Sequence, residues 1–229
     1  MAKLNKNEAL VSLRVLDGLE LSPDYPDIGF FEIDRRVFAE QYDSLSESEL
    51  GSSRLSVQWF HRNPSIYTVL LSGDKAVGYC NTMPLREDVF ESLMNGTLAD
   101  GEISAQMIER FDRAGPYRVF CCGVAILEDY RLGGLALRMM LAAIVSKYRT
   151  LAERGCWISD LAAVAWTEEG RALCEGLGLQ LVRAHQAHGD VYHARVVNVI
   201  GSPRRSVLSR LARTYKDRGL IPARECHQL

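Results

Sequence analysis

One stretch of the chain, residues 124–141, most constrains how it can fold. Its sequence is VAILEDYRLGGLALRMML. An apolar run is followed by a polar turn that contains Gly133 and Gly134, and then by a second apolar segment with helical periodicity. The pattern predicts a strand, a small-residue loop and the start of a long helix. Loop amides and a helix N-terminus together offer hydrogen-bond donors and partial positive charge. The junction is therefore suited to holding a phosphate group.

Length and composition fit one sizeable globular domain, or a domain with an appendage. The chain has 229 residues, of which 47% are hydrophobic and 24% are charged. The net charge of -2 excludes nucleic-acid binding driven by overall charge. No apolar run is long enough to span a bilayer, and the polar N-terminus does not resemble a signal peptide. The six cysteines form no Cys-x-x-Cys pair. We expect reduced thiols, a cytoplasmic location and no membrane partner.

The remaining pattern predicts an α/β fold with a mixed sheet. Predicted strands occupy residues 30–33, 66–71, 76–83, 117–126, 157–165, 179–182 and 190–197. Predicted helices occupy residues 35–42, 44–58 and 135–154, with a further short helix that begins after Thr167 and ends at Gly178. Residues 84–115 form a helical insert with two apolar helix faces, one around Phe90 and one from Ile103 to Phe111. We expect a lead-in segment (1–27), one domain (28–200) and a basic helical tail (201–229).

Two motifs carry a resemblance to a known family. Arg131-x-x-Gly134-x-Ala136 resembles the [Arg/Gln]-x-x-Gly-x-[Gly/Ala] acyl-CoA signature of the GNAT superfamily of N-acetyltransferases. The segment from Ala172 to Leu179, ALCEGLGL, is similar to the second landmark of that superfamily, Ala-x-x-Tyr-x-x-x-Gly-Phe. The order of the predicted elements from residue 30 to residue 197 also agrees. The two motifs at this spacing are more specific than either alone.

The resemblance implies an enzyme that uses acetyl-CoA as cosubstrate and a primary amine, on a small molecule or a protein, as acceptor. Acetyl-CoA would lie in a split between the strand that ends at Ile126 and the strand 157–165. Its pyrophosphate would sit on loop amides, its pantetheine arm would bond to strand main chain, and the amine would attack the thioester directly. The residues so implied in cofactor binding are Val124, Ile126, Arg131, Leu132, Gly133, Gly134, Leu135, Ala136 and Thr167.

The chain departs from the family pattern at three positions. Leu132 stands where glycine is common and Glu128 where proline is common, and neither change removes a loop amide. Cys174 occupies the position of the usual tyrosine, the family's proton donor to the CoA thiolate. A thiol can act as a general acid, but an inert buried cysteine with water as the donor explains the position equally well. Thr167 could offer its hydroxyl to the pantetheine, although helix capping alone also explains it.

No general base is evident from the sequence. Asp160 is a candidate because a carboxylate on a largely apolar strand is usually paired or functional, unless it lies on an exposed side. His185, His188 and His193 lie close together without the accompanying ligands of a metal site, so we predict no metal.

Two other functions are compatible with the sequence. The departure at Cys174 would allow a protein that binds acyl-CoA without turnover. Residues 203–224 carry seven basic residues against one acidic residue, with Leu208, Leu211, Ala212 and Tyr215 on one helical face. Such a segment is either a docked helix with a solvated basic face or a contact for nucleic acid. The sequence leaves an oligomeric state open.

Overall fold

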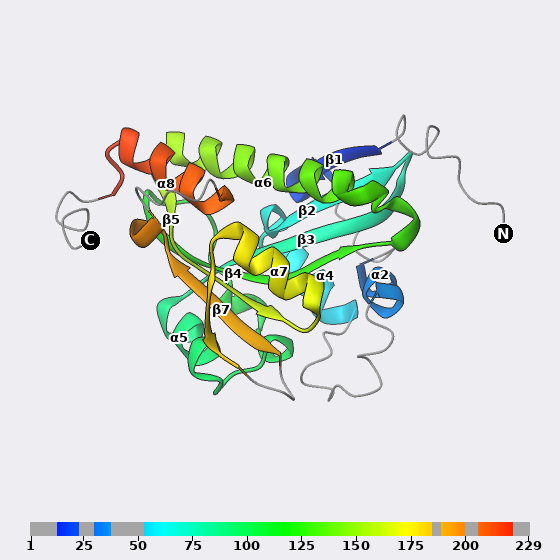
Figure 1. The fold of residues 1–229 in the computed structure, drawn as a ribbon, viewed down its shortest axis with the longest axis horizontal. Helices are drawn as coiled ribbons and strands as arrows, with labels where there is room; N and C mark the ends of the chain where they lie inside the picture. The colour runs from blue at the N-terminus through cyan, green and yellow to red at the C-terminus, as the bar shows by residue number, and fades with distance from the viewer. Residues whose placement is uncertain (1–12, 23–29, 38–52, 185–188, 200–205, 222–229) are drawn as a thin grey trace. The chain divides into compact units, whose positions relative to one another are not determined.

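In the computed structural model the described strands pair as a seven-stranded mixed sheet, in the order β1-β2-β3-β4-β5-β7-β6 (Figure 1). The strands are β1 (Leu13–Asp17), β2 (Tyr67–Ser72), β3 (Lys75–Leu85), β4 (Gly115–Ile126), β5 (Cys156–Ala165), β6 (Gln180–Arg183) and β7 (Asp190–Arg195). The β4–β5 pair is parallel, whereas β1–β2, β2–β3, β5–β7 and β6–β7 are antiparallel. The predicted α/β class with a mixed sheet is confirmed.

The structure describes residues 13–22, 30–37, 53–184, 189–199 and 206–221. The helices are α2 (Phe30–Val37), α4 (Ser53–Arg62), α5 (Glu87–Asn95), α6 (Leu135–Glu153), α7 (Glu168–Leu177) and α8 (Val207–Asp217). Short 3-10 turns are η1 (Gly18–Glu20), η3 (Pro64–Ile66), η4 (Asp100–Glu102), η5 (Ala105–Met107), η6 (Glu128–Tyr130), η7 (Leu132–Gly134) and η8 (Val196–Val199). Among the described helices, none combines the length and the apolarity that a bilayer span requires.

The chain divides into two compact units. The first unit comprises residues 1–82, 98–108 and 123–144, and the second comprises residues 83–97, 109–122 and 145–229. The boundaries fall inside β3, β4 and α6, so both units contribute residues to these elements.

An aromatic cluster forms the core of the first unit. The Phe30 ring stacks on Tyr67 at 4.6 Å between centroids, and Phe60 and Tyr79 also contact Tyr67. The predicted strand at residues 30–33 is wrong, because α2 begins at Phe30. Phe30 and Ile33 are both buried, and their spacing of three places them on one face of a helix. Residues 38–52 of the predicted helices lie outside the described residues, and α4 begins at Ser53.

The segment 1–27, expected as a lead-in, contains a strand of the sheet. β1 pairs antiparallel with β2, with Leu13 opposite Ser72 and Asp17 opposite Thr68. The Arg14 guanidinium also contacts the Asp74 carboxylate at 2.9 Å. The strand is stabilised by a partner far along the chain, which a local hydrophobic pattern does not show.

The insert 84–115 contains one of its two predicted helices. α5 forms as expected and is ended by Gly96, whose φ of +72° suits a glycine cap. The second predicted helix is wrong, because residues 103–111 form short turns and extended chain. Two of its carbonyls accept hydrogen bonds from side chains of α4: Trp59 Nε1 donates to Ile103 at 2.6 Å and Arg62 Nε donates to Ile108 at 3.0 Å. Tertiary partners thus take the place of helical amides.

The second unit packs α7 and α8 with the β5, β7 and β6 ladder. α7 begins after Thr167 and ends at Gly178, whose φ is +101°. Both predicted limits are therefore confirmed. Ser206 caps α8, its hydroxyl accepting from the Ser209 amide at 3.1 Å.

Candidate acyl-CoA site

The turn between β4 and α6 contains three successive residues in the left-handed region. The φ angles are +46° at Leu132, +61° at Gly133 and +83° at Gly134. Arg131, directly before them, is right-handed with φ -64° and ψ -31°. A right-handed residue followed by a left-handed one turns successive amides to the same side, which creates a concave site for an anion. Within the described chain, the Leu132 and Gly133 amides donate no backbone hydrogen bond.

Leu132 is the only non-glycine residue with positive φ among the described residues. An L-residue in this region is strained by about 1–2 kcal/mol, and such strain is retained mainly at ligand sites. This is the position where the family commonly has glycine. The backbone shape of the glycine pattern is therefore kept, although the side chain is not.

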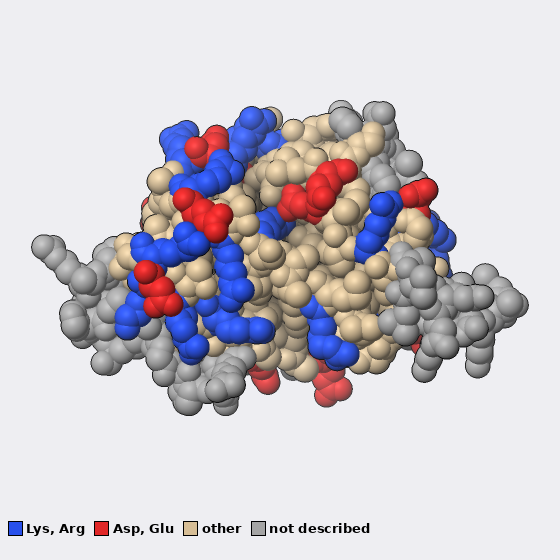
Figure 2. Space-filling model, turned by 90° about the horizontal axis from the view of Figure 1, so that it is seen from above, with Lys and Arg blue, Asp and Glu red and all other residues tan. Residues whose placement is uncertain are grey.

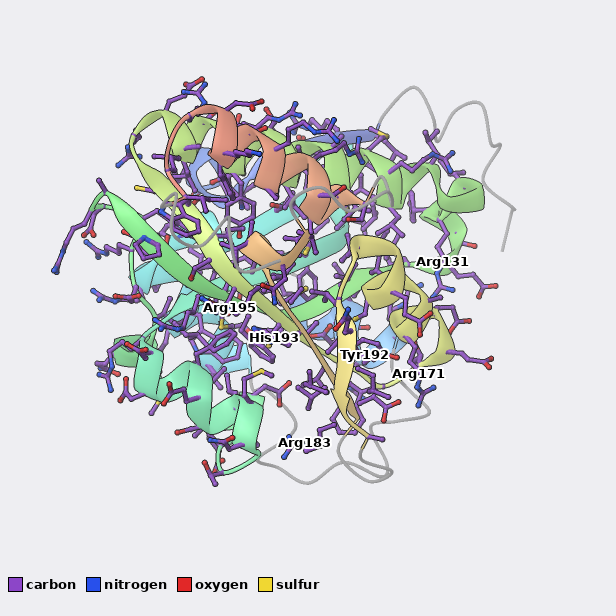
Figure 3. All side chains as sticks on the ribbon, turned by 60° about the vertical axis from the view of Figure 1, so that its left-hand side comes forward. Arg131, Arg171, Arg183, Tyr192, His193 and Arg195 are labelled. Carbon is purple, nitrogen blue, oxygen red and sulfur yellow. The ribbon has the colours of Figure 1, made fainter. Side chains whose placement is uncertain are left out.

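Two arginines flank this turn. Arg131 Nε donates to the Ile126 carbonyl at 3.2 Å, which leaves its terminal nitrogens available (Figure 3). A Cβ built on Gly134 would lie 3.4 Å from Nη1 of Arg138, so this second guanidinium covers the glycine. Arg131 and Arg138 are both exposed, and neither forms an ion pair with another described residue. Arg138 was missed in the sequence, although it lies one helical turn after Gly134.

The approach of β3 fixes the end of β4. The Leu127 amide donates to the Val77 carbonyl at 2.9 Å. A Cβ on Gly78 would lie only 2.8 Å from the Ala125 carbonyl oxygen, so this strand contact requires glycine. Ala136, in the first turn of α6, is fully buried at 0% exposure. The first unit therefore brings together Val124, Ile126 and residues 131–136 of the predicted cofactor site.

The parallel ladder between β4 and β5 ends early. Its last pair is Cys121 with Ala163, whereas β4 continues to Ile126 and β5 to Ala165. Cys122 and Val164, the next residues of the two strands, are not paired with each other. The ladder thus stops before the carboxyl ends of both strands.

Thr167 has a structural role in the second unit. Its Oγ1 accepts a hydrogen bond from the Gly170 amide at 3.0 Å, which caps α7. The hydroxyl proton is still able to donate, since capping uses only an oxygen lone pair. A contact between Thr167 and the pantetheine stays a prediction.

Cys174 lies on α7 with its side chain buried. Burial raises the pKa of the Cys174 thiol to about 12, and the nearby Cys121 and Glu175 contribute to the rise. A thiol that holds its proton so tightly is a weak donor to a CoA thiolate, since ordinary thiols have a pKa of about 8.5. The arrangement favours the inert interpretation of Cys174.

We therefore expect the Cys174→Ala variant to keep wild-type turnover at every pH, because no proton passes through this thiol. Thiol release from acetyl-CoA in the presence of an accepted amine measures this. Cys156→Ala, at another buried cysteine of the second unit, is the matched control. A drop in rate confined to Cys174→Ala would restore the proton-donor role.

Asp160 is paired. Its Oδ1 lies 3.0 Å from His193 Nε2 and 4.0 Å from Arg195 Nε, two residues that extend from β7 (Figure 3). Burial, the largest single influence, would raise the pKa of the Asp160 carboxyl. Hydrogen bonds with His193 and Ser159, together with the charges of His193 and Arg195, outweigh it, and the pKa falls below its usual range. A carboxylate with a lowered pKa is a poor base. The structural interpretation of Asp160 is thus favoured over the catalytic one.

The histidine group does not form a metal site in the described chain. His193 contacts Asp160 and the Phe90 ring, whereas His185 and His188 lie outside the described residues. No group of three or more metal-binding side chains occurs among the described residues.

α8 docks through its apolar face. Leu208, Leu211, Ala212 and Tyr215 are buried, and the Tyr215 ring lies 6.1 Å from Trp157. Arg210, Arg213 and Lys216 are exposed, and Arg218 pairs with Glu153 of α6 at 3.1 Å. Lys and Arg side chains gather on this side of the surface, with acidic side chains among them (Figure 2). The helix is part of the folded core and presents a solvated basic face.

Comparison with known proteins finds similarity only among solved structures. No family model and no curated protein matches the sequence. The PaiA N-acetyltransferase of Thermoplasma acidophilum, in complex with coenzyme A, aligns over 80% of this chain and 99% of its own, with 10% identity and a TM-score of 0.49. An acetyltransferase of Thermus thermophilus aligns over 80% and 97%, with 12% identity and a TM-score of 0.47. The loading GNATL domain of CurA from Lyngbya majuscula aligns over 80% of this chain and 97% of its own, with 12% identity and a TM-score of 0.46. These values are low, so the functional conclusion rests on this chain's own residues.

Proposed function

We propose that this protein is an N-acetyltransferase that transfers the acetyl group of acetyl-CoA to a primary amine. The observation that carries the proposal is the turn at residues 131–134. It combines a left-handed backbone run, two amides that have no backbone partner among the described residues, and a helix N-terminus. Arg131 and Arg138 add two positive charges that form no ion pair with another described residue. These features are what a diphosphate requires.

Each part of the site has a role in this proposal. The amides of Leu132 and Gly133 and the two guanidinium groups hold the pyrophosphate. The main chain of Val124 and Ile126 bonds to the pantetheine arm in the manner of an added strand. These contacts place the thioester and leave the chemistry to an attacking amine.

The reaction needs little covalent work from the protein. The amine nitrogen forms a bond to the thioester carbon, and the carbon–sulfur bond breaks with its electron pair leaving on sulfur. One group must accept the amine proton, and the thiolate must gain a proton. Neither Asp160 nor Cys174 suits these tasks, because the first has a lowered pKa and the second a raised one.

Two measurements on the full chain test the proposal. Calorimetric titration with CoA should show binding at one site. Thiol release from acetyl-CoA is then followed with spermidine, tryptamine and a lysine-containing peptide with a free N-terminus as probe amines. We expect release that depends on at least one of them. Binding without release from any probe would identify a silent acyl-CoA-binding protein instead. Absence of CoA binding at millimolar concentration would overturn both functions.

A further inference from the structure

A carboxylate and a tyrosine form a close pair in the first unit. The Tyr79 hydroxyl, on β3, donates to Oδ1 of Asp34, on α2, at 2.5 Å. Asp34 is half-buried, and the Phe30 ring of its own helix packs against Tyr79 at 5.2 Å. Packing in the aromatic cluster therefore fixes the Tyr79 ring, and the Tyr79 hydrogen bond fixes the Asp34 carboxylate.

This pair lies beside the carboxyl-terminal part of β4. A Cβ built on Gly123 would lie 3.2 Å from the Tyr79 hydroxyl oxygen, so the absence of a side chain gives this hydroxyl close access to the strand backbone. Gly123 directly precedes Val124, where the proposed function places the acyl-pantetheine main-chain contact. Asp34 and Tyr79 thus lie at the part of the first unit where the thioester would be held.

The surroundings of Asp34 suit a base at neutral pH. The pKa of the Asp34 carboxyl is raised from 3.8 to about 7. Burial is the largest cause of the rise and the charge of Asp100 on η4 adds to it, whereas the Tyr79 hydrogen bond lowers the pKa. The other ionisable side chains described on α2 and on α4, which packs against it, are Glu32, Arg35, Arg36, His61 and Arg62. Arg62 donates to the Ile108 carbonyl, as described above. A carboxylate that titrates close to the working pH is an effective general base.

We propose that Asp34 is the general base of the acetyl transfer and that Tyr79 is the residue that positions it. This inference rests on the proposed function. As the amine nitrogen bonds to the thioester carbon, its proton passes to a carboxylate oxygen of Asp34. The carbon–sulfur bond breaks, its electron pair leaves on sulfur, and the thiolate takes a proton from water. Asp34 then returns its proton to solvent.

The Asp34→Asn variant tests the base. The amide oxygen can still accept from Tyr79, so only proton acceptance is lost. For a probe amine that the wild type accepts, kcat/KM should fall by roughly 100-fold or more, while the dissociation constant of CoA stays unchanged. Glu32→Gln, at an exposed acid of the same helix, is the control and should keep full activity. A rate within about threefold of wild type for Asp34→Asn would overturn the proposal.

The Tyr79→Phe variant tests the positioning role through a pH profile. The wild-type kcat/KM should rise as pH increases through about 7, because the base must be ionised. Loss of the tyrosine hydrogen bond removes an interaction that favours the charged carboxylate. The rise of kcat/KM with pH should therefore occur at higher pH in Tyr79→Phe than in the wild type. In the control Tyr67→Phe it should occur at the same pH as in the wild type. A rise that does not move in Tyr79→Phe contradicts this role.

A measurement without substrate separates the two proposals. Folding raises the pKa of Asp34, so its ionisation destabilises the folded state as pH rises from about 4 to about 7. The melting temperature of Asp34→Asn should therefore increase relative to that of the wild type as pH rises from about 4 to about 7. Below about pH 4 the two melting temperatures should stay equal. If the difference is flat, Asp34 does not titrate as a poised base, whatever the outcome with CoA. If the difference appears but CoA does not bind, the proposed function fails while the titration of Asp34 stands.

Discussion

The double substitution Arg131→Ala with Arg138→Ala should raise the dissociation constant of CoA by roughly 100-fold. Each guanidinium can form charge-assisted hydrogen bonds with a phosphate oxygen, worth about 1.5–3 kcal/mol each. Both belong to exposed residues and neither has an ion-pair partner among the described residues, so no internal ion pair is lost with them. Calorimetric titration measures the affinity, and thermal unfolding should show a nearly unchanged midpoint.

A matched control for this pair is Arg149→Ala, at an exposed residue farther along α6. It removes the same kind of charge from the same helix away from the turn, and CoA affinity should stay at the wild-type value. The effect of the double variant should also shrink as salt is added, since screening weakens the charges it removes. Equal affinities of the double variant and the wild type at low salt would exclude the turn as the pyrophosphate site.

The order β4, turn, α6 could be predicted because its signals are local. The apolar run, the two glycines and the helical period all lie within residues 124–141, and the structure places the strand end at Ile126 and the helix start at Leu135. The left-handed conformation of Leu132 could not be predicted in this way, because a leucine gives no sign of positive φ. Only the similarity of its position to a family glycine indicated that shape.

The Asp34–Tyr79 pair was missed because its chemistry is tertiary. An aspartate on a short helix is ordinary in sequence, and its partner is 45 residues away. The incorrect strand at residues 30–33 also hid it. Phe30 and Ile33 are typical of strands in composition, and only burial on one helical face distinguishes the two forms. β1 was missed for a similar reason, since its partner β2 begins at Tyr67.

Replacement of Tyr215 by alanine should lower the free energy of unfolding by about 3–5 kcal/mol, the range for truncation of a large buried aromatic side chain. Tyr215 is 0% exposed and its ring contacts Trp157 on β5 edge to face. The substitution leaves a cavity between α8 and the strand that the surrounding backbone cannot fill completely. Urea denaturation followed by tryptophan fluorescence measures the change, and Trp157 reports it directly.

Arg213→Ala is the control on the same helix, because this side chain is exposed and its loss should change stability by less than about 0.5 kcal/mol. A stability change of similar size in both variants would show that α8 does not dock through Tyr215.

The docking of α8 through buried side chains also determines how its basic face can be tested. Because removal of residues after Asn198 would take away buried side chains, a loss of RNA affinity on truncation would be ambiguous. The triple substitution of Arg210, Arg213 and Lys216 by alanine removes exposed charge alone. If it leaves RNA binding unchanged, the basic face of α8 is a solvated surface.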